Sequence, residues 1–275
     1  MPRHRLDENE RLLAPVARAY RRKYLPLLKS VAPTAPLPDD AGTWPSDGPY
    51  AVLHLCGKYS DKDVSQKVWH RLAQHLTSKG LRLAFTGCGG EDEGKRIADV
   101  VRFLPKGSYR NFSGALSFGQ TAELLRRAAL YVGVDTSTTH VAAAVGVPVL
   151  ALFGPTSACH WGPAPSAGSR NFANHVSLQR SETVTILKNP DYADCRQCRT
   201  GHKTRCPRSS DTSLALCLQT MPPVVVFAEV DRILADRVDA SDPVSARTPY
   251  LSTKPDCKDP RASSRNGSNC SLQTV

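Results

Sequence analysis

Asp135, four hydroxyl residues and His140 directly follow an apolar stretch, and this part of the sequence has the clearest potential for chemistry. The apolar stretch, 130–134, is typical of a buried strand, and residues 141–145 are typical of a short helix that packs closely on a sheet. The hydroxyl turn, 136–139, would then lie between the carboxyl end of a strand and the amino end of a helix. Free backbone N–H groups and the helix dipole favour an anion there, so we predict a phosphate site.

The side chains of this stretch suit a phosphorylated sugar. Asp135 can accept hydrogen bonds from sugar hydroxyls, and His140 can donate one to a phosphate oxygen. Thr136, Ser137 and Thr138 would lie against the phosphate. A plainer interpretation is that the hydroxyl residues cap a helix and that His140 is a partly buried helix residue. The residues alone favour neither interpretation.

The elements that must position this turn recur as alternating strands and helices. A strand ends each time in a glycine-rich or polar loop, and a helix follows with its apolar residues on one face. We therefore predict an α/β fold, a Rossmann-like parallel sheet with flanking helices, which binds ligands at the carboxyl ends of its strands. The predicted strands cover 51–56, 81–86, 130–134 and 148–153, and the main predicted helices cover 64–79, 91–103 and 224–237.

The turn and the residues after it form an ordered motif: Asp135, Thr136, His140, Ala142 and Ala143, then Gly146 and Pro148, then Leu152–Thr156 and Trp161–Pro163. This motif resembles the nucleotide-binding signature of glycosyltransferase family 9, the ADP-heptose:lipopolysaccharide heptosyltransferases. One departure is Ser137, where the family usually has glycine; a positive φ there would cost serine about 1 kcal/mol more than glycine. The resemblance covers residues 50–237 and implies the C-terminal, donor-binding half of a GT-B enzyme.

The resemblance implies two further donor contacts. Lys67 and Trp69 match the Lys-x-Trp of the family's donor loop, where the lysine neutralises the diphosphate. Glu91, in preference to Glu93, matches a Gly-x-Glu turn whose carboxylate holds the ribose. The loop before Lys67 is longer than usual, and His70 stands where the family has proline. Without the resemblance, Lys67 is a surface lysine and Glu91 an acid in the first turn of a helix.

Four of the nine cysteines are clustered in the sequence. Their pattern, C-x2-C-x7-C-x10-C, suits a structural tetrahedral Zn or a single Fe, and family members often carry a comparable run. The alternative is a group of reduced thiols in a loop. Sugar transfer itself would require no cofactor. The cysteines are Cys195, Cys198, Cys206 and Cys217.

Composition limits the classes of function. A chain of 275 residues with 40% hydrophobic content can form a sizeable core, and no apolar stretch is long enough to span a membrane. The basic start lacks the apolar segment of a signal peptide, so we expect a cytoplasmic protein. A net charge of +11 indicates anionic partners. A nucleic-acid-binding metal module is disfavoured, because a second CxxC and interleaved aromatic residues are lacking.

The chain divides into three expected parts. Residues 1–49 are a basic helical segment, which could contact the inner face of a membrane, and a Pro-rich linker. Residues 50–238 form the nucleotide-sugar-binding domain, and 239–275 should be disordered. Only about 50 residues precede the first strand, too few for an acceptor domain. We therefore expect that half to be missing and assign no catalytic base; a fragment, a split enzyme and a late start codon remain alternatives.

The expected function is glycosyl transfer by direct displacement at the anomeric carbon. A sugar, heptose by resemblance, would pass from a nucleotide-diphosphate donor such as ADP-heptose to lipopolysaccharide core or a similar glycan acceptor. Lys67, the turn and His140 would stabilise the leaving diphosphate. The alternatives are a nucleotide-sugar-binding protein without turnover, and half of a split enzyme that works with a separate acceptor-domain polypeptide. Nucleic acid is not an expected partner.

Overall fold

The computed structural model describes residues 35–38, 44, 48–165, 171–195, 198 and 206–240, with no side-chain description for 238–240. The expectations for the basic segment 1–30 and for the tail from residue 241 onward lie outside these residues. In the described part of the chain, no helix combines the length and apolar character needed to cross a membrane.

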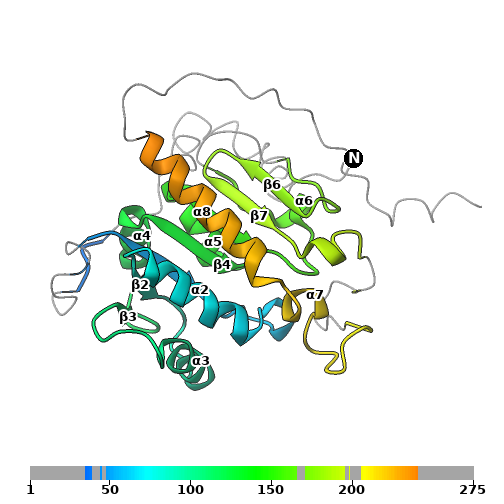
Figure 1. Ribbon diagram of the computed structural model, residues 1–275, viewed down its shortest axis with the longest axis horizontal. Coiled ribbons are helices and arrows are strands. Elements are labelled where there is room, and N and C mark those ends of the chain that lie inside the picture. Colours follow the sequence, from blue (N-terminus) through cyan, green and yellow to red (C-terminus); the bar gives the residue numbers. More distant parts are fainter. Residues whose placement is uncertain are drawn as a thin grey trace, which may run out of the picture.

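A seven-stranded sheet forms the centre of the molecule, in the order β3-β2-β1-β4-β5-β7-β6 (Figure 1). Neighbouring strands are parallel except β6, which runs antiparallel to β7. The α/β, Rossmann-like class is therefore confirmed. The strands are β1 (Tyr50–His54), β2 (Arg82–Phe85), β3 (Tyr109–Asn111), β4 (Leu130–Val134), β5 (Val149–Leu152), β6 (Leu178–Ser181) and β7 (Val184–Leu187).

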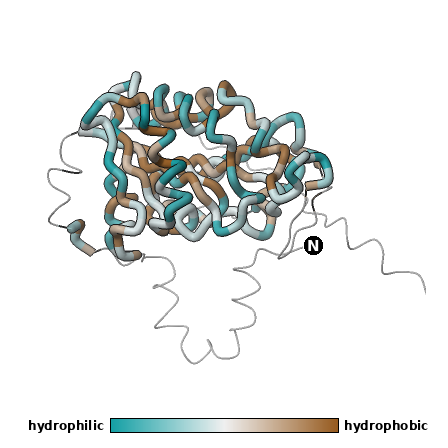
Figure 2. The backbone as a smooth tube through the Cα atoms, turned by 90° about the horizontal axis from the view of Figure 1, so that it is seen from below, coloured by the Kyte–Doolittle hydropathy of each residue, from teal (hydrophilic) through white to brown (hydrophobic). Residues whose placement is uncertain are grey.

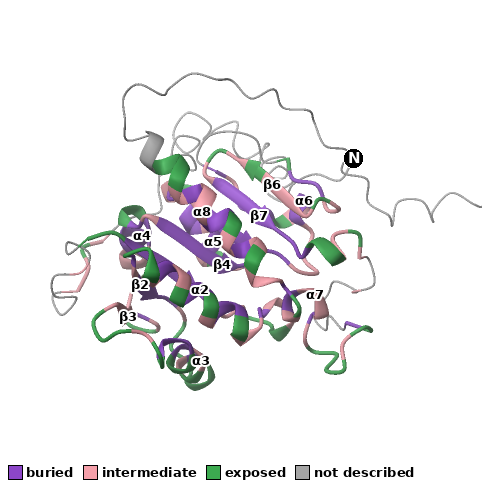
Figure 3. Cartoon of the chain, in the orientation of Figure 1, coloured by how far each residue is buried: buried purple, intermediate pink, exposed green. Residues whose placement is uncertain are grey.

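Helices cover both faces of the sheet. Leu53 and Leu83 belong to one apolar core with α2, α3 and α8, whereas their strand neighbours Val52 and Ala84 belong to the other core with α4 and α5. The hydrophobic strands lie inside this sandwich, and the buried residues follow them (Figures 2 and 3). The longer helices are α2 (Gln66–Ser78), α3 (Glu91–Val101), α4 (Phe118–Arg127), α5 (Ser137–Val145) and α8 (Pro223–Ala240); the short ones are η2 (Ser60–Lys62), α6 (Ala158–Trp161), η3 (Pro190–Tyr192) and α7 (Leu216–Gln219).

A hydrogen bond with a tyrosine of β4 attaches the start of α5 to the sheet. A Cβ on Gly133 would lie 2.2 Å from the Tyr131 hydroxyl oxygen, so glycine is needed for that side chain to lie along the strand. The Tyr131 hydroxyl is 2.8 Å from Thr139 Oγ1 in α5. At the other end, Gly146 ends α5 in a left-handed conformation (φ 79°), as its position in the sequence predicts. The start of α5 is thereby fixed at the end of β4.

The structure differs from the predicted turn at one point. Helix α5 begins at Ser137, so the expected hydroxyl turn is the first turn of the helix. Glu182 is the only described non-glycine residue with a positive φ, and Ser137 therefore carries no left-handed strain. A serine fits this position as well as a glycine does.

Candidate functional site

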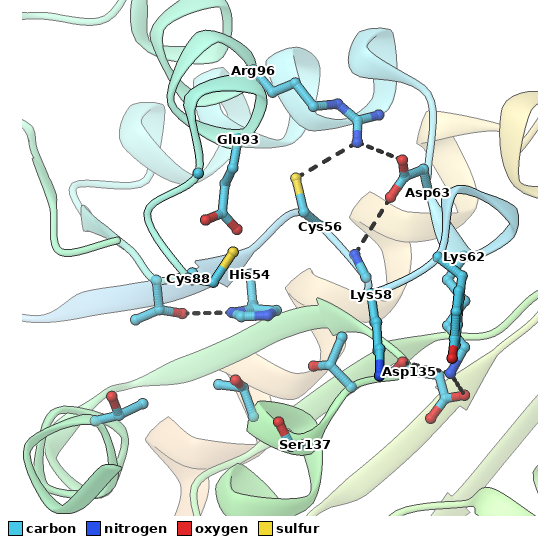
Figure 4. A pocket seen from close by; sticks show the side chains of 18 of the residues that line it. His54, Cys56, Lys58, Lys62, Asp63, Cys88, Glu93, Arg96, Asp135 and Ser137 are labelled. Atoms are coloured by element: carbon cyan, nitrogen blue, oxygen red, sulfur yellow. Dashed lines mark hydrogen bonds and ion pairs between the residues drawn. The ribbon is translucent and has the colours of Figure 1, made fainter. Parts of the chain in front are cut away.

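A cleft of about 1020 Å³ opens at the carboxyl ends of β1, β2 and β4 (Figure 4). Strands β1 and β4 are neighbours at the centre of the sheet, and the chain continues outward from them in opposite directions. Open α/β sheets bind ligands at this kind of switch point, because the loops on its two sides separate there. The cleft is lined by the end of β1, the loops after β1, β2 and β4, and the first turns of α3 and α5. Arg96, Phe112, Leu116, Thr121 and Trp161 complete the lining.

Most of the predicted donor-binding residues lie in this cleft. Lys67 does not: it is an exposed residue in the first turn of α2 and is not part of the lining. Lys67 therefore lies apart from the other predicted residues, and the roles of the others stay predictions. Those that line the cleft are Glu91, Asp135, Thr136, Ser137, Thr138 and His140.

Lys62 places a cation in the cleft, where the sequence pattern led us to expect Lys67. Its Nζ lies 2.7 Å from Asp135 Oδ2 and 3.1 Å from the Asp135 carbonyl oxygen. The Asp135 carboxylate is buried, and Lys58 also lines the cleft. The Lys-x-Trp spacing missed Lys62 because the longer loop folds into η2, which points this lysine at the end of β4. The extra length of the loop was the only signal in the sequence.

The first turn of α5 faces the cleft with Ser137 and Thr138. Thr136, the N-cap, makes no side-chain capping bond, and the first N–H groups of any α-helix lack partners within the helix. His140 Nε2 lies 4.0 Å from Asp135 Oδ1. Thr139 faces the opposite way and is 1% exposed. The turn can therefore hold an anion, with a cation and an imidazole beside it.

His54, the last residue of β1, lines the deep part of the cleft and was not predicted. Its ring is buried, and Nδ1 lies 3.0 Å from Thr86 Oγ1. Burial lowers the pKa of His54 to about 4, so the ring is neutral at physiological pH. In the sequence, an apolar strand that ends in histidine shortly before a glycine loop only weakly indicates a histidine that lines a cleft.

Acidification should destabilise the domain through His54. A histidine whose pKa is about 4 when folded and about 6.5 when unfolded favours folding above pH 6.5, and this contribution is lost as the pH falls toward 4. We expect a loss of about 3 kcal/mol between pH 7 and pH 4. Urea unfolding at several pH values measures it. The His54→Gln variant should show a flatter profile, and an equal pH slope in both proteins would contradict this assignment.

Glu91 and Glu93 have different environments. Glu93 is 6% exposed and accepts a hydrogen bond from Gly89 N at 2.8 Å. Its carboxylate fills the space that a Cβ on Gly87 would need, and so it shapes the turn after β2. Glu91 is exposed and, within the described part of the chain, forms an ion pair with Lys95 at 2.7 Å. An exposed pair of this kind is weak, so Glu91 can turn to a ligand at little cost.

The four clustered cysteines also approach one another in the structure. Burial first, and then the neighbouring thiols, raise the pKa of Cys198 to about 12 and that of Cys217 to about 11. Burial opposes ionisation of Cys206, but hydrogen bonds from backbone N–H groups and from Cys198 leave its pKa lowered. Among the described residues, no group of three or more His, Cys, Asp or Glu is arranged to hold a metal ion.

Comparison with known proteins relates this chain to heptosyltransferases. The sequence model of glycosyltransferase family 9 (heptosyltransferase) matches residues 14–189. The chain is 30% identical over 114 residues to lipopolysaccharide heptosyltransferase 3 of Escherichia coli K12, covering 42% of this chain and 33% of that protein. It is 29% identical over 137 residues to lipopolysaccharide heptosyltransferase 1 of Pseudomonas aeruginosa, covering 44% and 36%. The matched part thus spans about a third of the length of these relatives.

One solved structure supports the fold. The E. coli ADP-heptose lipopolysaccharide heptosyltransferase II aligns with a TM-score of 0.53 at 16% identity, over 75% of this chain and 54% of that one.

Proposed function

The chain belongs to glycosyltransferase family 9, and from this premise we propose that it provides the donor-binding part of a heptosyltransferase. The sugar, heptose, passes from a nucleotide-diphosphate donor, ADP-heptose, to lipopolysaccharide core or a similar acceptor. The observation that carries the proposal is the cleft at the β1–β4 switch point, where Lys62 and the first turn of α5 line one cavity. A lipid-borne acceptor would bring the protein to the inner face of the membrane.

The residues of the cleft fit an inverting displacement. The acceptor oxygen bonds to the anomeric carbon as the bond from that carbon to the diphosphate breaks, and the acceptor hydroxyl loses its proton to a base that we do not assign. The N–H groups of α5, Lys62 and His140 stabilise the negative charge that grows on the leaving diphosphate. Asp135 accepts from sugar hydroxyls and anchors Lys62. Thr136, Ser137 and Thr138 surround the phosphate.

Glu91 is the proposed ribose ligand, because its carboxylate is free to move whereas that of Glu93 is committed to Gly89. We expect Glu91→Gln to weaken ADP binding about fivefold, the loss of roughly one hydrogen bond, with an unchanged melting temperature. Glu93→Gln should lower the melting temperature. Calorimetric titration and thermal unfolding measure both, and unchanged affinity in Glu91→Gln would remove Glu91 from the site.

Calorimetric titration with ADP, ADP-heptose and a UDP-sugar tests the function. We expect binding of ADP and ADP-heptose and none of the UDP-sugar; failure to bind either adenine ligand would overturn the proposal. Transfer is then assayed with a lipopolysaccharide acceptor, alone and with an added acceptor-domain polypeptide. Transfer that requires the added polypeptide indicates a split enzyme. Binding without transfer in every mixture indicates a nucleotide-sugar-binding protein.

A metal at the cysteine cluster stays a prediction of the sequence. Four thiols are a donor set that structural Zn or a single Fe accepts, and Cys198 and Cys206 already interact. A bound ion would draw Cys195, Cys198, Cys206 and Cys217 into one tetrahedron and stabilise the fold there. Elemental analysis of the purified protein should find about one metal per chain. Metal content near zero, unchanged after incubation with Zn²⁺ or Fe²⁺, would remove the site.

A further inference from the structure

The loop between β1 and α2, which carries Lys62, is held by a segment far away in the sequence, residues 211–219. Ser60 Oγ donates to the Ser213 carbonyl oxygen at 3.1 Å, and Ser65 N donates to that of Leu218 at 3.4 Å. Gln219 Nε2 donates to the Asp63 carbonyl oxygen at 2.7 Å. The last part of this segment is α7, which lies beside the loop in Figure 1.

The loop is also held from inside the cleft. Arg96 Nη1 of α3 lies 2.6 Å from Asp63 Oδ2, and Gly57 N donates to Asp63 Oδ1 at 3.4 Å (Figure 4). Burial raises the pKa of Asp63 even though Arg96 opposes this. Asp63 is therefore fixed by its carboxylate on one side and by its carbonyl on the other. Lys62 precedes it directly, so its position depends on both attachments.

We infer that residues 211–219, called the strap below, position Lys62 for the donor, and that Gln219 is the positioning residue. The inference rests on the proposed donor site. Asp63 is buried, so its carbonyl oxygen needs a donor, and Gln219 supplies one next to the lysine. Without that bond the loop gains freedom, and the Lys62 ammonium spends less time where a diphosphate binds.

The strap is itself fixed to the sheet. Asn189, which is 1% exposed and follows β7, donates to the Cys217 carbonyl oxygen at 2.9 Å and to Thr220 Oγ1 at 3.2 Å. Leu218 packs against Gly154, where a Cβ would lie 2.6 Å from the leucine side chain. Cys217 lies within the strap, next to Leu218, whose carbonyl oxygen accepts from Ser65 N of the donor loop.

Gln219→Leu and Gln219→Glu test the inference by ADP titration. The leucine removes the amide, and the isosteric glutamate removes its N–H at neutral pH with little change in packing. Both should raise the dissociation constant about five- to tenfold, the usual effect of one lost hydrogen bond. Gln179→Leu is the matched control, because Gln179 also bonds a backbone, at Ala173, but lies on β6 outside the cleft. It should bind ADP with unchanged affinity.

A double variant with Lys62→Met separates positioning from general destabilisation. If Gln219 acts through Lys62, Gln219→Leu adds no further loss of affinity to Lys62→Met. Additive losses, unchanged affinity in both Gln219 variants, or an equal loss in Gln179→Leu would each overturn the inference. Absence of ADP binding in the unaltered protein would instead overturn the donor-site proposal beneath it.

Discussion

Lys62→Met should weaken ADP binding about 100-fold, because the variant removes the cation that lies beside the proposed diphosphate seat. Charge-assisted hydrogen bonds to phosphate contribute about 1.5–3 kcal/mol each, and a tenfold change in affinity corresponds to about 1.4 kcal/mol. Methionine keeps much of the length of the apolar stem. Calorimetric titration measures the change, and the difference between variant and unaltered protein should shrink in high salt.

Lys67→Met is the matched control for this prediction. Lys67 is five residues further along the same loop–helix segment, is exposed, and lies outside the cleft. Its variant should bind ADP as the unaltered protein does. Lys62→Met also leaves the buried Asp135 carboxylate without its 2.7 Å partner, so unfolding must be measured in parallel. An equal loss in both variants would place the diphosphate on another surface.

Asp135→Asn should distinguish binding of the nucleotide from binding of the sugar. ADP should bind within twofold of its original affinity or more tightly, because a negative charge near the diphosphate is removed and Lys62 keeps the Asp135 carbonyl oxygen at 3.1 Å. ADP-heptose should bind at least about tenfold more weakly relative to ADP, since a neutral amide accepts hydrogen bonds from sugar hydroxyls less strongly than a carboxylate. The ratio of the two dissociation constants is the measured quantity.

Asp99→Asn controls for the change in net charge, because Asp99 is exposed on α3 and does not line the cleft. Its ratio of dissociation constants should equal that of the unaltered protein. If Asp135→Asn weakens ADP and ADP-heptose equally, the carboxylate serves only as the anchor of Lys62 and makes no contact with the sugar.

The central strands were predictable because burial on both faces leaves a direct record in the sequence. β1, β2, β4 and β5 are short apolar runs bounded by loop residues, as expected for parallel strands covered by helices. β3 (Tyr109–Asn111) and β6 (Leu178–Ser181) are at the two edges of the sheet and are only partly buried. Their strand conformation depends on pairing with a neighbour, which periodicity does not show.

Among the site residues too, those placed by local sequence could be predicted, and those placed by distant parts of the chain could not. Asp135 and the first turn of α5 could be located because their place depends on consecutive elements, a strand followed by a helix. Lys62 could not, because its position depends on η2, on Arg96 and on Gln219, which come from separate parts of the chain. Glu91 and Glu93 are two residues apart, and only packing around Gly87 distinguishes their roles.

The two edge strands of the sheet are poor sites for the addition of a further strand. β3 has three residues, and β6 has four and is antiparallel to its neighbour, so neither presents a long row of free backbone groups to another strand. A second domain that covers the proposed donor site would contact the loops at the mouth of the cleft. This contact would also cover the opening through which the nucleotide enters and leaves. A tighter contact between the two domains would therefore slow release of the nucleotide product.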